Sequence, residues 1–119
     1  MKPFNPKGQY TVLTPEGTYK AHVQYAYERV SRNGNPYVSL GFRLADTNRV
    51  LFRNYFLDGD PESFAVQRSA EEFARVALVS GVDDLITDPK QLITGVQFTL
   101  TVSHYTDKNG VAQEEVRFS

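Results

Sequence analysis

The sequence has no cysteine and no tryptophan, and only two of its 119 residues are histidines. Without cysteine the chain can form neither disulfides nor thiolate metal sites, which suits a reducing compartment. His22 and His104 each lack carboxylates at ligand spacing, so we expect surface histidines on strands rather than metal ligands. The sequence therefore predicts a protein without a metal or another cofactor.

Long apolar runs are missing as well. Residues 1–6 contain no apolar segment of signal-peptide length, and no run in the chain approaches the length of a membrane span. We therefore expect a soluble, cytoplasmic protein with no membrane partner. A length of 119 residues is typical of one domain with its own core.

Motifs of the common enzyme classes are also absent. The chain has no phosphate-binding loop, no nucleophile elbow and no dinucleotide fingerprint. Asp83 and Asp84 follow the end of a predicted helix, where solvated turn residues are common, and Asp58 and Asp60 fit a turn and a helix cap. We predict that the protein is not an enzyme.

The charge that is present is divided unevenly along the chain, although the formal net charge is only −1. Residues 1–57 carry eight Lys or Arg against three Asp or Glu, a net +5, whereas residues 58–119 carry five against eleven, a net −6. All tyrosines except Tyr105 lie in the basic half. A basic, tyrosine-rich sheet is typical of single-strand binding surfaces. The alternative is that tyrosines favour half-buried strands and that surface charges scatter by chance.

Three segments in the basic half alternate between apolar and polar residues, which predicts an antiparallel meander of strands over residues 18–30, 37–44 and 50–57. In the first strand we expect one face to carry Tyr19, Ala21, Val23, Tyr25 and Tyr27. In the second we expect Val38, Leu40, Phe42 and Leu44 to be buried. The third strand is ambiguous, because Phe52 and Phe56 share one face while Leu51 and Leu57 share the face of Arg53. The turn between the first two strands contains Asn33 and Gly34, which suit positive φ angles.

The acidic half begins with a predicted helix. Asp60 can cap it, Pro61 suits its first position, and Gly81 ends it with Val82 in contact. Alternatively, a capping box at Ser69 breaks the helix near Gln67. A short second helix is expected from Asp88 to Thr94, followed by strands over residues 96–103 and 111–118 with a turn at residues 107–110.

The predicted order is strand, strand, strand, helix, strand, strand. That order indicates a mainly β protein with one main helix, folded as a five-stranded OB-fold-like barrel. Residues 1–16 form a predicted extended N-terminal arm, in which residues 9–13 suit a short edge strand, and residues 17–119 form a single OB-fold-like domain. We expect Phe42, Phe73 and Leu100 to meet inside the barrel.

Several motifs also carry a family resemblance. They are Gly17-Thr18-Tyr19-Lys20-Ala21 with Val23, the turn Asn33-Gly34-Asn35-Pro36 before Leu40-Gly41-Phe42, the strand over residues 50–57, the helix ending in Gly81, and Leu92-Ile93-Thr94-Gly95. With these motifs the chain resembles the DUF669 family of small bacteriophage proteins, which are similar to single-stranded-DNA-binding proteins. The resemblance implies single-stranded DNA as a partner and a role in phage-type DNA replication or recombination, in the host cytoplasm if a phage encodes the protein.

The candidate DNA-binding residues are outward-facing tyrosines and basic residues of the first three strands, with further basic residues in the flanking loops. They are Lys20, His22, Arg29, Arg32, Tyr37, Arg43, Arg53, Tyr55 and Lys108. We expect them to form one continuous strip. The alternative function is a protein-interaction module that docks a replication or recombination protein on the same face, since such surfaces are also enriched in Tyr and Arg. The sequence leaves the oligomeric state open, a dimer included.

Overall fold

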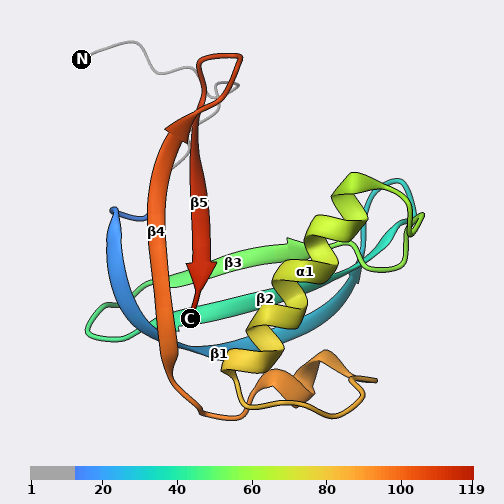
Figure 1. The fold of residues 1–119 in the computed structure, drawn as a ribbon, viewed down its shortest axis with the longest axis horizontal. Helices are drawn as coiled ribbons and strands as arrows, with labels where there is room; N and C mark the ends of the chain where they lie inside the picture. Colours follow the sequence, from blue (N-terminus) through green and yellow to red (C-terminus); the bar gives the residue numbers. More distant parts are fainter. Residues whose placement is uncertain (1–12) are drawn as a thin grey trace.

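A computed structural model describes residues 13–119 and shows one five-stranded antiparallel sheet with a helix and a short 3₁₀ helix (Figure 1). The elements are β1 (Gly17–Val30), β2 (Pro36–Leu44), β3 (Val50–Tyr55), α1 (Phe64–Val79), η1 (Pro89–Leu92), β4 (Phe98–Thr106) and β5 (Ala112–Phe118). This order confirms the predicted mainly β chain with one main helix between the third and fourth strands. Residues 9–12 of the proposed edge strand, and most of the proposed arm, lie outside the described residues.

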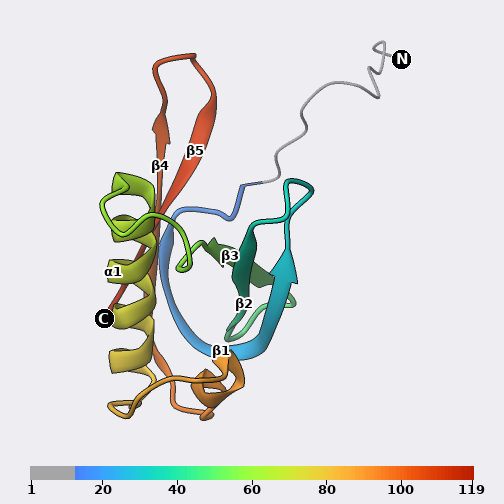
Figure 2. The same ribbon diagram turned by 90° about the vertical axis from the view of Figure 1, so that its right-hand side faces the viewer.

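The sheet is curved but is not closed into a barrel. Its strand order is β3-β2-β1-β4-β5, so β3 and β5 are its two edges and no ladder joins them within residues 13–119. The predicted OB-fold-like barrel is therefore not closed by strand pairing. Helix α1 contacts both edge strands, so the helix rather than a fifth ladder connects the two edges of the sheet (Figure 2). A groove of about 1180 Å³ lies between β3, α1 and β5.

The core lies between the inner face of the sheet and α1. Phe42 and Leu100 are fully buried and Phe73 is 9% exposed, which confirms that all three belong to one core. The ring of Phe42 packs against the rings of Phe98 and Phe118, with centroids 6.0 and 4.9 Å away. Burial of these large apolar rings is the main contribution that the inner face makes to stability.

Helix α1 begins later than the sequence indicates and is not broken. Asp60 accepts a hydrogen bond from the backbone N–H of Glu62 in a turn before the helix, and Ser63 is the N-cap residue. The proposed capping box at Ser69 does not form, because its hydroxyl accepts from the N–H of Phe56 in the segment after β3. Ser69 thus forms a hydrogen bond to this segment, and the helix continues where a break was predicted.

The C-terminus of α1 is as predicted. Gly81 has a φ of 81°, its N–H bonds to Leu78 O, and the N–H of Val82 bonds to Ala77 O. This pair of bonds is the Schellman arrangement, in which glycine adopts the left-handed conformation at little cost.

The short element η1 is also confirmed, with narrower bounds than the predicted helix. Asp88 and Gln91 form a capping box around it, and Leu92 is fully buried beneath the sheet. The neighbouring Ile93 is 45% exposed.

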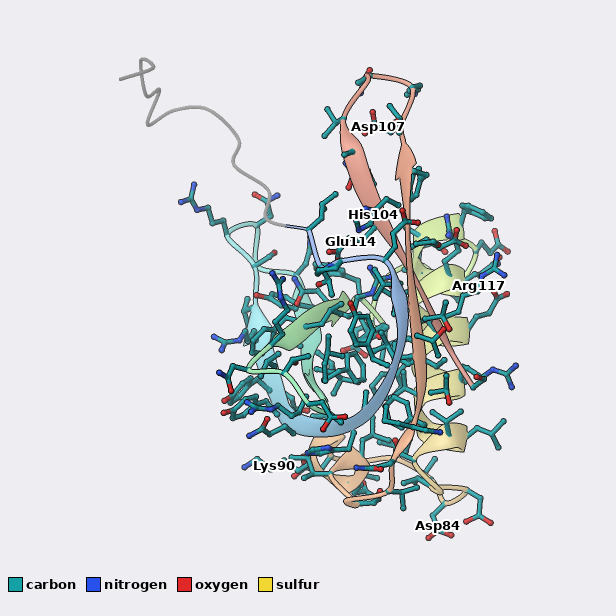
Figure 3. The ribbon with its side chains drawn as sticks, turned by 90° about the vertical axis from the view of Figure 1, so that its left-hand side faces the viewer. Asp84, Lys90, His104, Asp107, Glu114 and Arg117 are labelled. Carbon is teal, nitrogen blue, oxygen red and sulfur yellow. The ribbon has the colours of Figure 1, made fainter. Side chains whose placement is uncertain are left out.

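The β4–β5 hairpin projects from the body and has the predicted turn at its tip, where Asp107 lies (Figure 3). Nearer the body, the hairpin binds the segment that precedes β1. The Nε2–H of His104 donates to the carbonyl of Thr14 at 2.6 Å, and the carboxylate of Glu114 accepts from the Thr14 N–H. These bonds fix the start of β1 against the hairpin.

Candidate nucleic-acid interface

The alternation of inward and outward side chains on β1 reverses part-way along the strand. Val23 faces the core opposite Phe42, but the pairing register shifts between Val23 and Tyr25, so that Ala26 is the next buried side chain. Such a shift is a β-bulge, in which one extra residue reverses the alternation. The prediction that Tyr25 and Tyr27 share one face with Val23 is therefore wrong: Val23 is buried, whereas their side chains are 37% and 39% exposed.

The bulge creates an outer face on β1, β2 and β3, made of four rows of paired residues. The rows are His22–Arg43–Val50, Tyr25–Gly41–Phe52, Tyr27–Ser39–Asn54 and Arg29–Tyr37. Lys20 continues the same face of β1, opposite Thr99 of β4. We call this set the outer face; no acidic residue occupies a position in its four rows.

The centre of the outer face is a stack of three aromatic rings. The centroid of the Tyr25 ring lies 6.0 Å from that of Tyr27 and 6.1 Å from that of Phe52, with interplanar angles of 13° and 16°. Phe52, on the edge strand, is 53% exposed. A second aromatic pair lies at the fourth row, where Tyr37 and Phe56 have centroids 5.0 Å apart.

Basic residues lie in the rows on either side of this stack. The guanidinium of Arg29 lies over the ring of Tyr27, 4.8 Å from its centroid, in a cation–π contact. Arg43 and His22 occupy the row beyond Tyr25 and Phe52, and Lys20 follows them along β1. The outer face thus combines flat apolar rings with positive charge, as single-strand binding surfaces do.

Two of the predicted site residues, Arg53 and Tyr55, lie on the inner face instead. They share the inward parity of Leu51, and Tyr55 is only 1% exposed. Arg53 donates to Glu72 of α1 from Nε to Oε2 at 3.1 Å and from Nη2 to Oε1 at 2.7 Å. Neither residue is therefore available to the outer face.

Burial and the charge of Glu72 together shift the pKa values of Tyr55 and Arg53. Burial raises the pKa of the Tyr55 hydroxyl, and the negative charge of Glu72 raises it further, so the hydroxyl is neutral at any physiological pH. Burial lowers the pKa of Arg53, but the hydrogen bonds and charge of Glu72 outweigh that effect and raise it. Tyr55 is therefore a neutral core residue next to a half-buried ion pair.

The two predicted loop residues lie in separate hairpins. Arg32 is exposed in the turn that joins β1 to β2, close in sequence to the Arg29 end of the outer face. Lys108 is in the turn of the β4–β5 hairpin, which projects apart from the β1–β2 hairpin in both ribbon views (Figures 1 and 2). The structure thus brings together Lys20, His22, Arg29, Tyr37 and Arg43, but not Arg53, Tyr55 or Lys108.

Sequence reasoning missed the three stacked rings as site residues. For Phe52 a signal was present, because Leu51 and Leu57 share the parity of Arg53 and would leave Phe52 outward. For Tyr25 and Tyr27 there was none, since nothing in the sequence marks the bulge at Gln24.

Within residues 13–119, His, Asp and Glu side chains form no group of three or more that could hold a metal ion. In the same part of the chain no helix is long and apolar enough to cross a membrane. No protein-family model and no curated protein matches the chain. The resemblance to the phage single-strand-binding proteins stays a prediction.

Proposed function

We propose that the protein binds single-stranded DNA on its outer face without strong sequence preference, and that it is not an enzyme and needs no cofactor. The observation that carries this proposal is the stack of Tyr25, Tyr27 and Phe52, exposed on the sheet and flanked by basic residues. Large exposed aromatic rings on a soluble domain usually mark a binding surface.

The chemistry follows from the two kinds of side chain. Each unpaired base offers a flat π-face, and stacking on an aromatic side chain contributes about 1 to 3 kcal/mol per base for any base. Arg29, Arg43 and Lys20 contribute a salt-dependent attraction to the phosphates. In a duplex the faces of the bases are already stacked and inaccessible. It can therefore bind only through the attraction to its phosphates, and should bind much more weakly.

The topology supports an OB-fold-like assignment as part of this proposal. In that fold a five-stranded, partly open sheet binds oligonucleotides across strands 2 and 3 and through the adjoining loops. The strand order β3-β2-β1-β4-β5 and the helix between β3 and β4 fit such a domain opened between its third and fifth strands. A role in phage-type DNA replication or recombination is supported by the sequence resemblance alone.

The test is a binding titration with three labelled probes of equal length. Fluorescence anisotropy reports binding, and the titration is repeated at several salt concentrations. The probes are oligo-dT, a mixed-sequence single strand and a blunt duplex. We expect the two single strands to bind with similar affinity and the duplex to bind far more weakly, with affinity falling as salt rises. Equal binding of all three probes would indicate charge attraction alone. No binding at low salt would favour a protein-docking role for the outer face.

A further inference from the structure

Gly41 lies at the centre of the outer face, between Tyr25 of β1 and Phe52 of β3. Glycine weakens a strand, so its presence in the central row needs a physical reason. A positive φ is not the reason, because Gly41 is not among the residues in that conformation. The remaining reason is space: a Cβ on residue 41 would lie 2.9 Å from Cε1 of Phe52 and 3.0 Å from Cδ2 of Tyr25.

The two rings therefore occupy the volume that a side chain on residue 41 would fill. Directly paired residues on neighbouring strands of a sheet are about 5 Å apart, and β1 and β3 are separated by β2, so side chains on these two strands meet only by leaning over the strand between them. Their centroid separation of 6.1 Å shows that Tyr25 and Phe52 do so above Gly41.

This arrangement leaves the stack with one covered end and one open end. At the Tyr27 end the Arg29 guanidinium already lies over the ring. At the other end, Phe52 is the most exposed of the three rings and belongs to an edge strand, whose outer side has no paired strand within the described residues. A flat ligand therefore has access to the stack at Phe52.

We propose that Gly41 is a positioning residue, which holds Tyr25 and Phe52 in one stack so that an unpaired base of the single strand stacks on Phe52 at the edge of β3. This inference rests on the proposed function. Packing of two rings over a glycine would by itself affect only the stability of the sheet. The proposal assigns to Gly41 an additional role in ligand binding.

The test compares Gly41→Ala with Ser103→Ala, a control on β4 that lies outside the outer face. We expect Gly41→Ala to weaken oligo-dT binding by about 5-fold to 150-fold, which corresponds to the loss of one stacked base at about 1 to 3 kcal/mol. Its near-ultraviolet circular dichroism should change in the tyrosine region without DNA, because Tyr25 must move. Ser103→Ala should leave both properties near those of the unchanged protein.

A double variant separates positioning from general damage. If Gly41 acts through the stack, then Gly41→Ala combined with Phe52→Ala should bind no more weakly than Phe52→Ala alone. A folded Gly41→Ala variant that binds like the unchanged protein would overturn the proposal. If Gly41→Ala does not fold, Phe52→Leu takes its place: it keeps Gly41 and most of the side-chain volume but lacks the flat ring, and undiminished binding would equally overturn the proposal.

Failure of the unchanged protein and of Ser103→Ala to bind oligo-dT would overturn the proposed function, and with it the binding role of Gly41. The dichroism of Gly41→Ala would still report on the position of the rings, so the two failures can be told apart.

Discussion

The guanidinium of Arg53 and the carboxylate of Glu72 form a bidentate ion pair that links the edge strand β3 to helix α1, with the shorter contact at 2.7 Å. The side chains are 34% and 20% exposed, so the pair is partly shielded from water. Because the sheet is not closed between β3 and β5, this tie is one of the few polar links that hold α1 against the β3 edge.

Glu72→Ala should therefore lower the free energy of unfolding by about 1 to 3 kcal/mol, since it leaves a half-buried guanidinium without its partner. Urea denaturation measures the change. The matched control is Glu115→Ala, which removes the exposed partner of Arg117 at 3.4 Å and should cost less than about 1 kcal/mol. Equal small losses in both variants would show that the Arg53 pair contributes no more than a surface pair.

Phe42→Ala should lower the free energy of unfolding by about 3 to 5 kcal/mol, because it leaves a cavity next to Phe98 and Phe118. A loss of this size is a large fraction of the stability of a small domain, so the variant should be largely unfolded at moderate temperature. A thermal midpoint equal to that of the unchanged protein would contradict the assignment of Phe42 to the core.

Tyr55→Phe removes a buried hydroxyl that has no hydrogen-bond partner in the structure. Losing an unsatisfied polar group in the core is neutral or stabilising, so we expect an unchanged or higher denaturation midpoint. Oligo-dT affinity should also be unchanged, because Tyr55 faces the core. A clear loss of affinity would show that the inner face takes part in binding.

Asp107 gives the β4–β5 turn a dependence on pH. A hydrogen bond from the N–H of Val111, with further bonds from Gln113 and the N–H of Asn109, holds the pKa of the Asp107 carboxyl below its ordinary value of 3.8. The folded-state pKa is thus the lower one, so the stabilisation is present above the ordinary value and is lost as the pH falls through the folded-state value.

Asp107→Asn should consequently lower stability relative to the unchanged protein near neutral pH, and this difference should shrink in strong acid. Urea denaturation of both proteins over a series of pH values measures it. A difference between the two proteins that does not vary with pH would mean that the carboxylate charge is not what stabilises the turn.

The sequence predicted the order of the elements, because strand alternation, turn residues and the Gly81 helix end are local signals. It did not predict the open sheet, since closure depends on how α1 packs between distant strands. The faces of Tyr25 and Tyr27 were assigned wrongly for a similar reason: a bulge is one extra residue, and Gln24 has no distinctive composition.

The candidate site was predicted in part. The basic residues Lys20, Arg29 and Arg43 reach the outer face because their strands alternate regularly near them. Arg53 was assigned outward because it alternates with Phe52 and Phe56, yet its charge is paired with that of Glu72, 19 residues away in sequence on α1. Such a partner cannot be identified from the pattern of one strand.

The salt dependence of binding tests the basic residues one by one. Arg43→Ala and Arg29→Ala should each reduce the slope of log affinity against log salt by about one, if each side chain contacts one phosphate. Arg117→Ala, on β5 outside the outer face, is the control and should leave the slope unchanged. Identical slopes for all three variants would place the phosphate contacts elsewhere.

The most direct test of the account is a titration with oligo-dT at low salt that follows the intrinsic emission of tyrosine, which can be used because the chain contains no tryptophan. Bases that reach the outer face should quench this emission in a saturable way, and Phe52→Ala should weaken binding by about 1 to 3 kcal/mol while leaving the domain folded. Binding of single-stranded DNA with no quenching, or with the affinity of Phe52→Ala equal to that of the unchanged protein, would contradict a binding site built on the aromatic stack.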